Sequence, residues 1–353
     1  MEVNLSRANV FNLKKMGISM IALLVLLGIA YAFSLAQTPM HADKLIDVSE
    51  GEKYWQKQIE TVGGAAAHKQ LAEAIAGLIP GQQHTAAHIF GGALYEEEGL
   101  DGLAVCDTRF LYGCFHEFLT RAVVHSGLSI LPKLEEMCLA SPHANAPLSC
   151  EHGLGHAILS YFGYEKEDLN SALEACRTLK HDAASSCPSG VFMEYNLRTF
   201  VEADGSAVRK ISNGDFYDPC REYRSTEAKR CVRQLPLWWQ RAIFSNTLDR
   251  AAFSWMGQKC RALPQELSQF KAGCFRTIGF IAAVAVNPEV ESIDAYCETA
   301  ADESQDFAGC ILAAGMALKN NKGLTKGLEL CAQLPDEDKL ECQYYVQFLP
   351  LGM

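Results

Sequence analysis

Fourteen cysteines recur along the chain as seven successive pairs, and this spacing constrains the fold more than any other feature. The pairs are Cys106 and Cys114, Cys138 and Cys150, Cys176 and Cys187, Cys220 and Cys231, Cys260 and Cys274, Cys297 and Cys310, and Cys331 and Cys342. Their second members follow one another at intervals of 32 to 44 residues, a length typical of two-helix repeats. Since the number is even and no C-x-x-C occurs, we predict structural disulfides between sequence neighbours rather than a redox or zinc site.

Apolar stretches with helical spacing flank these pairs. Leu169 and Leu173 lie four residues apart just before Cys176, as on the core-facing side of a helix, and an apolar run resumes after Cys187. A further unit of the same kind, without cysteines, precedes the first pair at residues 69–94. Strand-like alternation is scarce. We therefore predict an all-α, solenoid-like array of about eight helical hairpins, in which each disulfide joins the end of one helix to the start of the next.

The N-terminal segment carries an export signal. Arg7, Lys14 and Lys15 precede an uncharged apolar run at residues 16–36. Because a run of about 20 apolar residues can span a bilayer, we predict one transmembrane signal anchor, with residues 1–15 in the cytoplasm. Small residues near the end of the run leave a cleaved signal peptide, and hence a secreted protein, as the alternative. Either way the bulk is periplasmic or extracellular, where disulfides persist.

The rest of the chain divides by composition. We predict a linker at 37–51, His-rich helical repeats at 52–200, a polar connection at 201–215 and C-terminal helical repeats at 216–353. A hydrophobic content of 49% without low-complexity tracts indicates a folded protein. The net charge of −11, with acidic residues spread along the chain, argues against nucleic acid as a partner.

Five of the ten histidines occupy equivalent positions of successive units: His84, His88, His116, His152 and His156. His116 and His152 lie two residues after the second cysteine of their units, and His84 lies two residues after Gln82, which stands in the place of that cysteine in the leading unit. The other two follow four residues later, on the same face of the helix. Equivalent helices of a solenoid point the same way, so we expect the five imidazoles to converge.

Imidazole is a good ligand for zinc, copper and iron, so this register predicts a transition-metal site. We expect Glu117 or Glu194 to serve as a base or as a further ligand. The motifs of zinc proteases, serine hydrolases and covalent haem are absent, whereas a non-covalent haem with two histidine ligands stays open. The remaining histidines are interpreted as surface or loop residues: His41, His68, His125, His143 and His181.

These features predict a membrane-anchored extracytoplasmic metalloprotein, with a metal-dependent hydrolase or oxidoreductase as the first hypothesis. The alternatives are a non-enzymatic repeat scaffold that binds a peptide or a membrane-protein partner, and a protein for metal capture or delivery. In two later units an arginine, Arg233 or Arg276, lies two residues after the second cysteine. These arginines could contact an anionic group, although exposed arginines on a solvated helix are the more usual case.

Overall fold

The computed structural model describes residues 41–349 except for 43, 142, 144, 145, 181–185, 200–207, 246 and 286–289. Residues from Ala42 onward form one compact unit. Within the described ranges the secondary structure consists of fifteen α-helices and six short 3₁₀ helices, without a strand. The prediction of an all-α fold is confirmed.

The first half of the compact unit contains, in chain order, η1 (Lys44–Ile46), α2 (Val48–Val62), α3 (Gly64–Ala74), α4 (Pro80–Glu98), η2 (Gly99–Val105), η3 (Phe110–Tyr112), α5 (Gly113–Ser126), η4 (Leu128–Ile130), α6 (Leu131–Leu139), α7 (Ala146–Phe162), α8 (Lys166–Cys176) and α9 (Ser186–Leu197). The second half contains η5 (Cys220–Glu222), α10 (Ser225–Phe244), α11 (Arg250–Arg261), η6 (Ser268–Phe270), α12 (Lys271–Ala285), α13 (Val290–Ala300), α14 (Ser304–Lys322), α15 (Leu324–Cys331) and α16 (Asp336–Phe348).

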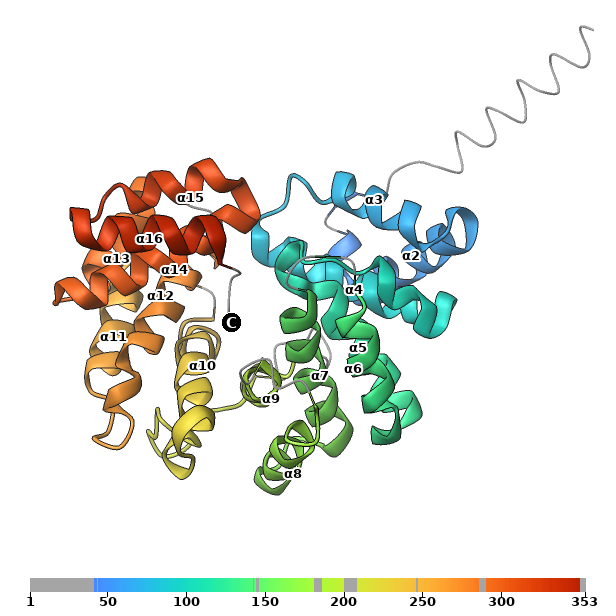
Figure 1. Cartoon of the computed structure of the whole chain (residues 1–353), viewed down its shortest axis with the longest axis horizontal. Coiled ribbons are helices and arrows are strands. Elements are labelled where there is room, and N and C mark those ends of the chain that lie inside the picture. The colour runs from blue at the N-terminus through green and yellow to red at the C-terminus, as the bar shows by residue number, and fades with distance from the viewer. Residues whose placement is uncertain are drawn as a thin grey trace, which may run out of the picture. The chain divides into compact units, whose positions relative to one another are not determined.

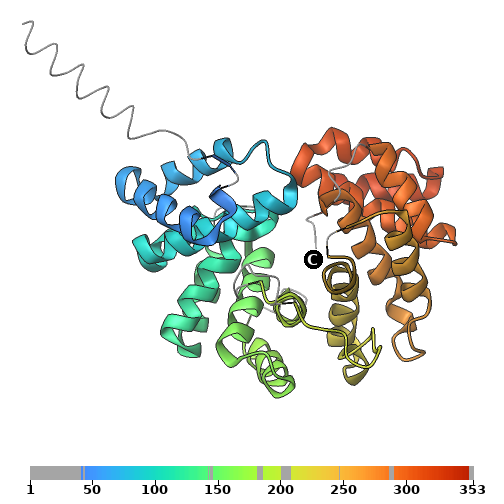
Figure 2. The same cartoon turned by 180° about the vertical axis from the view of Figure 1, so that it is seen from behind.

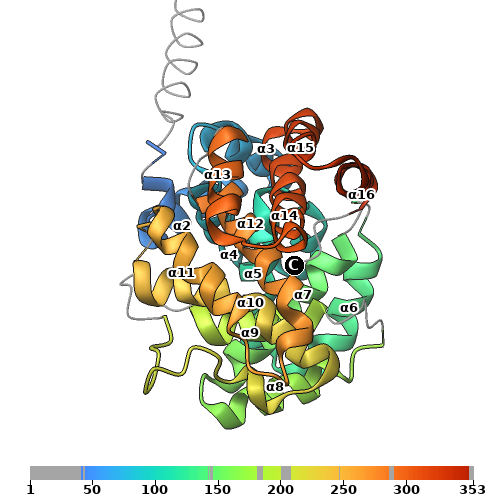
Figure 3. The same cartoon turned by 90° about the vertical axis from the view of Figure 1, so that its left-hand side faces the viewer.

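One series of helices packs in chain order, and shorter elements cover it from the side. The series is α4, α5, α7, α9, α10, α12 and α14, each in contact with the next. The colours in both views follow this order from helix to helix (Figure 1, Figure 2). The covering helices α11 and α13 lie beside each other (Figure 3). Helix α4 also contacts α12, so helices that are far apart in the sequence meet.

All seven disulfides join the cysteines that neighbour each other in the sequence, as predicted. Their Cα–Cα distances lie between 5.4 and 5.7 Å, the usual range for a disulfide. Five bridges tie the last turns of one α-helix to the first two turns of the next. In the units of Cys106 and Cys220 the predicted first helix is wrong, because η2 and η5 stand there instead. Gly99, at φ +57°, and Pro219 interrupt the helical backbone at these points.

The ordered unit begins earlier than the predicted boundary at residue 52. Helix α2 starts at Val48, inside the segment interpreted as a linker, and the Asp47 carboxylate caps it by accepting a 2.8 Å hydrogen bond from the Glu50 amide. Leu45 and Trp55 are fully buried. The sequence 48–62 therefore belongs to the core rather than to a tether.

Two other predictions fall wholly or partly outside the described residues. These are the anchor at 16–36 and residues 201–207 of the polar connection. Among the described helices, none has both the length and the apolar character needed to cross a membrane. Helices α9 and α10, which flank the polar connection, pack against each other.

Two glycines let α7 and α9 meet backbone to backbone. A Cβ atom at Gly155 would overlap the carbonyl oxygen of Cys187, and one at Gly190 would overlap that of His152. The start of α9, fixed by its disulfide, is thereby pressed against the part of α7 that carries His152 and His156. Small residues at both positions are a condition of this close approach.

We expect Gly190→Ala to lower the free energy of unfolding by about 1–3 kcal/mol, because the added methyl group must push the two helices apart. Thermal unfolding measures this change. Gly77→Ala is the matched control, since nothing lies within 4 Å of the added Cβ. Equal melting temperatures for the two variants would contradict the packing described.

Candidate metal centre

The structure brings the five phased histidines together from three adjacent helices. His84 and His88 lie on α4, His116 lies on α5, and His152 and His156 lie on α7. They form two groups of three, in each of which one ligand nitrogen from every residue lies within 4.8 Å of the others, and both groups contain His116. These groups can hold a metal ion.

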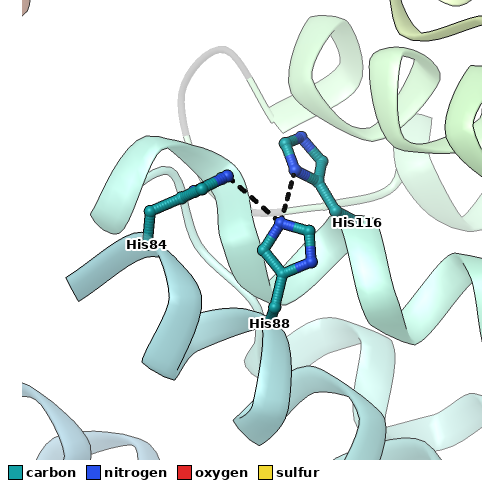
Figure 4. A group of neighbouring side chains, drawn as sticks. All are labelled: His84, His88 and His116. Atoms are coloured by element: carbon teal, nitrogen blue, oxygen red, sulfur yellow. Dashed lines mark hydrogen bonds between the residues drawn. The ribbon is translucent and has the colours of Figure 1, made fainter. Parts of the chain in front are cut away.

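The first group consists of His84, His88 and His116 (Figure 4). His88 Nε2 lies 3.1 Å from His84 Nε2 and 3.1 Å from His116 Nδ1. Nitrogens that bind one ion at about 2.0–2.1 Å lie roughly 3.0–3.4 Å apart, so this spacing fits a shared ion. His84 Nδ1 donates a 2.8 Å hydrogen bond to the Phe110 carbonyl, which leaves the Nε2 lone pair directed at His88.

Proton counting favours a cation at this point. The Nε2 atom of His88 can share one proton with His84 or with His116, but not with both. Of the two close nitrogen pairs that involve His88 Nε2, the atoms of the other one would then face each other with no proton between them. A metal ion accepts all three lone pairs at once, so the donor set suits a metal better than a hydrogen-bonded network.

The second group consists of His116, His152 and His156. His156 Nε2 lies 3.1 Å from His152 Nε2, and the His116 and His156 rings stack with centroids 4.5 Å apart. All three side chains are buried. His116 Nε2 is buried without a hydrogen-bond partner, although Nδ1 of the same ring faces the first group. As a neutral ring His116 can offer the lone pair of one nitrogen, on either side, and it can ligate on both sides at once only after losing its ring proton.

A buried carboxylate supports the second group from behind. His156 Nδ1 donates a 2.8 Å hydrogen bond to Glu194 Oε2, which keeps His156 Nε2 available as a ligand. Tyr164 and Thr199 donate to the same carboxylate at 2.8 and 2.6 Å. Although burial opposes ionisation, the hydrogen bonds from His156, Thr199 and Tyr164 hold the pKa of Glu194 below its ordinary value. A carboxylate behind a ligating histidine orients the ring and raises its basicity.

Burial keeps the imidazoles of His84, His88, His116 and His152 neutral. It lowers the pKa of His84 to about 4, although the bond to Phe110 opposes this shift. Burial, reinforced by neighbouring histidines, also holds the pKa values of His88, His116 and His152 well below 6.5. Neutral rings have the free lone pairs that metal binding requires.

We expect the metal-free protein to lose stability as the pH falls from about 6.5 towards 4. In this window the unfolded chain binds protons at these histidines and the folded chain does not, so the free energy of unfolding falls with the pH. The shift of His84 alone corresponds to about 3 kcal/mol. The raised pKa of Glu117 has the opposite effect on the free energy of unfolding, but it is a single group, whereas four histidines have lowered pKa values. Urea unfolding at pH 7 and pH 5 measures the effect, and His84→Asn should reduce the difference between the two pH values. A urea midpoint that stays constant or rises at pH 5 would contradict the buried neutral rings.

The structure places Glu117 in an ion-pair network rather than among the histidines. Its carboxylate accepts a 3.0 Å hydrogen bond from Arg121, which also approaches Glu52 and Glu96. Burial raises the pKa of Glu117 to about 8, although Arg121 opposes this shift. Within the described residues the two metal groups contain histidines only. The role of Glu117 as a base stays a prediction.

The backbone that holds His84 is strained. Phe110, Leu111 and Tyr112 have φ values of +54°, +53° and +67°, a left-handed conformation that side chains other than glycine rarely adopt. This segment lies inside the short loop closed by the disulfide between Cys106 and Cys114. Its Phe110 carbonyl is the group that fixes the ring of His84. Strain of this kind commonly concentrates at functional sites.

The interpretation of His68 as a surface residue is wrong. This side chain is buried on α3, against the Phe90 ring, and its Nδ1 accepts a 3.2 Å hydrogen bond from Arg109. The side chain is buried because α3 packs with α4 as a hairpin, and a single histidine in the sequence does not predict that contact. His125 is exposed as predicted, His143 is half-buried in a loop, and His181 lies outside the described residues.

The chemistry of the donors limits the cofactor. The spacing of the nitrogens in the first group fits a bare ion, since His88 Nε2 lies 3.1 Å from His84 Nε2, and a non-covalent haem stays a prediction. Imidazole donors alone suit zinc, copper or iron. Comparison of the chain with protein-family models, curated proteins and solved structures finds no match.

Proposed function

We propose that this protein is a transition-metal enzyme that holds an ion in the histidine groups, or two ions if His116 loses its ring proton and bridges them as an imidazolate. One observation carries the proposal: two sets of three histidines, drawn from α4, α5 and α7, whose ligand atoms lie within 4.8 Å of one another. We propose further that the paired helices form about eight hairpin repeats, and that residues 16–36 anchor the chain with its bulk outside the cytoplasm.

The number of ligands favours catalysis over a structural role. Structural sites surround the ion with four protein ligands, whereas three leave one coordination position open. A metal ion held by three imidazoles can activate water or polarise a substrate oxygen, and copper or iron can instead support redox chemistry. We propose a hydrolase first, because three histidines are a ligand set with which zinc activates water.

The chain's own residues hold and orient the ligands. The Phe110 carbonyl fixes the ring of His84, and the Glu194 carboxylate fixes that of His156. The close contact of α7 with α9 brings this carboxylate to the ring, since Glu194 lies on α9. The helix packing therefore sets the spacing of the ligand atoms before any ion binds.

We expect Glu194→Gln to weaken metal binding at the second group by about 10–100-fold, because an amide orients the His156 ring less firmly and withdraws the negative charge behind it. Competition with a chromophoric chelator measures the affinity. Glu117→Gln is the matched control and should leave both affinities unchanged, since Glu117 faces Arg121. An equal loss in the two variants would contradict the assignment of Glu194 as the supporting carboxylate.

Metal-dependent turnover tests the proposed function. Full-length protein from an oxidising compartment is stripped, reloaded with zinc, copper or iron, and assayed for hydrolysis of phosphate, sulfate and carboxylic esters and for oxygen consumption. We expect turnover with one metal in one reaction class, and its loss in His116→Ala. Bound metal without turnover in any assay would overturn the enzyme proposal and favour capture or delivery.

A further inference from the structure

The short helix η3 connects the histidine site with the second half of the compact unit. It contacts all three helices that carry the five histidines, α4, α5 and α7, and it also contacts α14. Helix α14 belongs to the second half and follows η3 by almost 200 residues in the chain. The second half of the array therefore touches the segment that holds the ring of His84.

Tyr112 supplies a side-chain link between these elements. Its ring is buried, and its hydroxyl forms hydrogen bonds with the side chains of Ser149 and Asn320. Ser149 lies on α7, three residues before His152, and Asn320 lies in the last turn of α14. One hydroxyl group thus joins η3 both to a histidine-bearing helix and to the second half of the array.

The same short helix lies directly against the start of α4. The Phe110 carbonyl accepts the 2.8 Å hydrogen bond from His84 Nδ1. A Cβ atom at Gly113 would lie 2.6 Å from the His84 carbonyl oxygen and 3.1 Å from His84 Nδ1, so the backbone on either side of Tyr112 touches His84. Because Phe110 and Tyr112 are separated by one residue, a displacement of Tyr112 also displaces the carbonyl that orients the His84 ring.

The left-handed backbone of η3 depends on such support. Positive φ values at Phe110, Leu111 and Tyr112 are unfavourable for residues with side chains, and they persist only where surrounding contacts determine them. The disulfide between Cys106 and Cys114 closes the loop at its ends, and the Tyr112 hydroxyl fixes its interior to α7 and α14. Without these hydrogen bonds the segment can relax, and the Phe110 carbonyl moves away from the His84 ring.

We propose that Tyr112 and Asn320 are positioning residues for the first histidine group, so that the second half of the array sets its metal affinity. Asn320 holds the Tyr112 hydroxyl, the backbone of η3 transmits this restraint to the Phe110 carbonyl, and the carbonyl fixes the ring of His84. The effect on metal binding rests on the proposed function. The inference gives a role to the C-terminal helices, which carry none of the five histidines.

Exchange of the His84 ring proton tests the positioning in the metal-free protein. NMR of isotope-labelled full-length protein detects the Nδ1 proton of His84, and its loss in His84→Asn identifies the signal. We expect Tyr112→Phe and Asn320→Ala each to speed its exchange with solvent at least about tenfold, because the Phe110 carbonyl then holds it less firmly. Asn320→Ala changes an exposed position and keeps the test open if Tyr112→Phe fails to fold.

Tyr217→Phe is the matched control for the loss of a hydroxyl group. Its hydroxyl donates a 3.0 Å hydrogen bond to the Lys259 carbonyl on α11, so the variant also loses a hydrogen bond between distant segments. The exchange of the His84 proton should match that of the wild type. A purely structural role for Tyr112 would lower the melting temperature and leave this exchange unchanged, which would overturn the inference.

Zinc binding measures the consequence for the metal site. Competition with a chromophoric chelator gives the zinc affinity of the reloaded full-length protein. We expect Tyr112→Phe and Asn320→Ala each to weaken binding by about tenfold, as is usual when a group that supports a ligand is removed. The double variant should bind no more weakly than Tyr112→Phe alone, because both changes break the same link.

The outcomes separate this inference from the proposed function. Where the wild type binds zinc, an unchanged affinity in both variants, or additive losses in the double variant, overturns the inference. If the wild type binds neither zinc, copper nor iron, the proposed function fails. Faster exchange of the His84 proton in the two metal-free variants then still supports Tyr112 and Asn320 as the residues that position His84.

Discussion

Replacing His116 by alanine removes metal from both histidine groups at once. Each histidine group then keeps two imidazoles. Removing a residue that only supports a ligand lowers metal affinity by up to roughly 100-fold, and we expect a larger loss at both histidine groups because a ligand itself is removed. The reason is that His116 is the ligand shared by both groups, from a buried position on α5. Metal content after dialysis against a weak chelator measures the loss.

His125→Ala provides the control for this experiment. His125 lies on the same helix but is exposed and belongs to neither group, so its removal should leave the metal content unchanged. His152→Ala and His84→Ala should each affect one group more than the other. A wild-type metal content in His116→Ala would refute the shared-ligand arrangement.

Removing the disulfide between Cys138 and Cys150 should cost stability and metal binding together. The bridge closes a loop with a sequence separation of 12, so the chain-entropy model gives about 3 kcal/mol for the double Cys→Ser variant. Cys150 lies two residues before His152, and its bridge fixes the start of α7. We expect the melting temperature to fall and the second histidine group to release metal before the first.

The bridge between Cys331 and Cys342 gives a matched comparison. Its sequence separation is 11, so its removal should cost a similar amount of stability. It lies on α15 and α16, away from the helices that carry the histidines, and metal binding should persist. Equal metal loss in the two variants, under conditions where both are folded, would mean that the disulfides do not position the ligands locally.

The sequence predicted those features that repeat. Cysteine pairs at regular intervals predicted all seven disulfide partners and, in five of the seven units, the two helices that the bridge joins, because a bridge over 8 to 14 residues can join only neighbouring segments. Histidines in one register predicted a common site for the same reason. Equivalent positions of successive packed helices face the same side, as His116 and His152 do.

The features that the sequence did not predict depend on contacts between distant segments. Tyr164 and Thr199 reach Glu194 from loops outside the register, so no spacing rule identifies them. His68 is buried because of how α3 packs on α4. The contact between α4 and α12 links elements almost 200 residues apart, and no spacing in the sequence predicts it.

X-ray absorption spectroscopy on the full-length protein as purified tests the central claim most directly. We predict stoichiometric metal whose inner shell consists of nitrogen and oxygen, with the outer-shell scattering of about three imidazoles for each ion and no sulfur ligand, since every cysteine described is in a disulfide. Absence of stoichiometric metal, or a metal environment without imidazole scattering, would contradict the assignment of these five histidines as a metal centre.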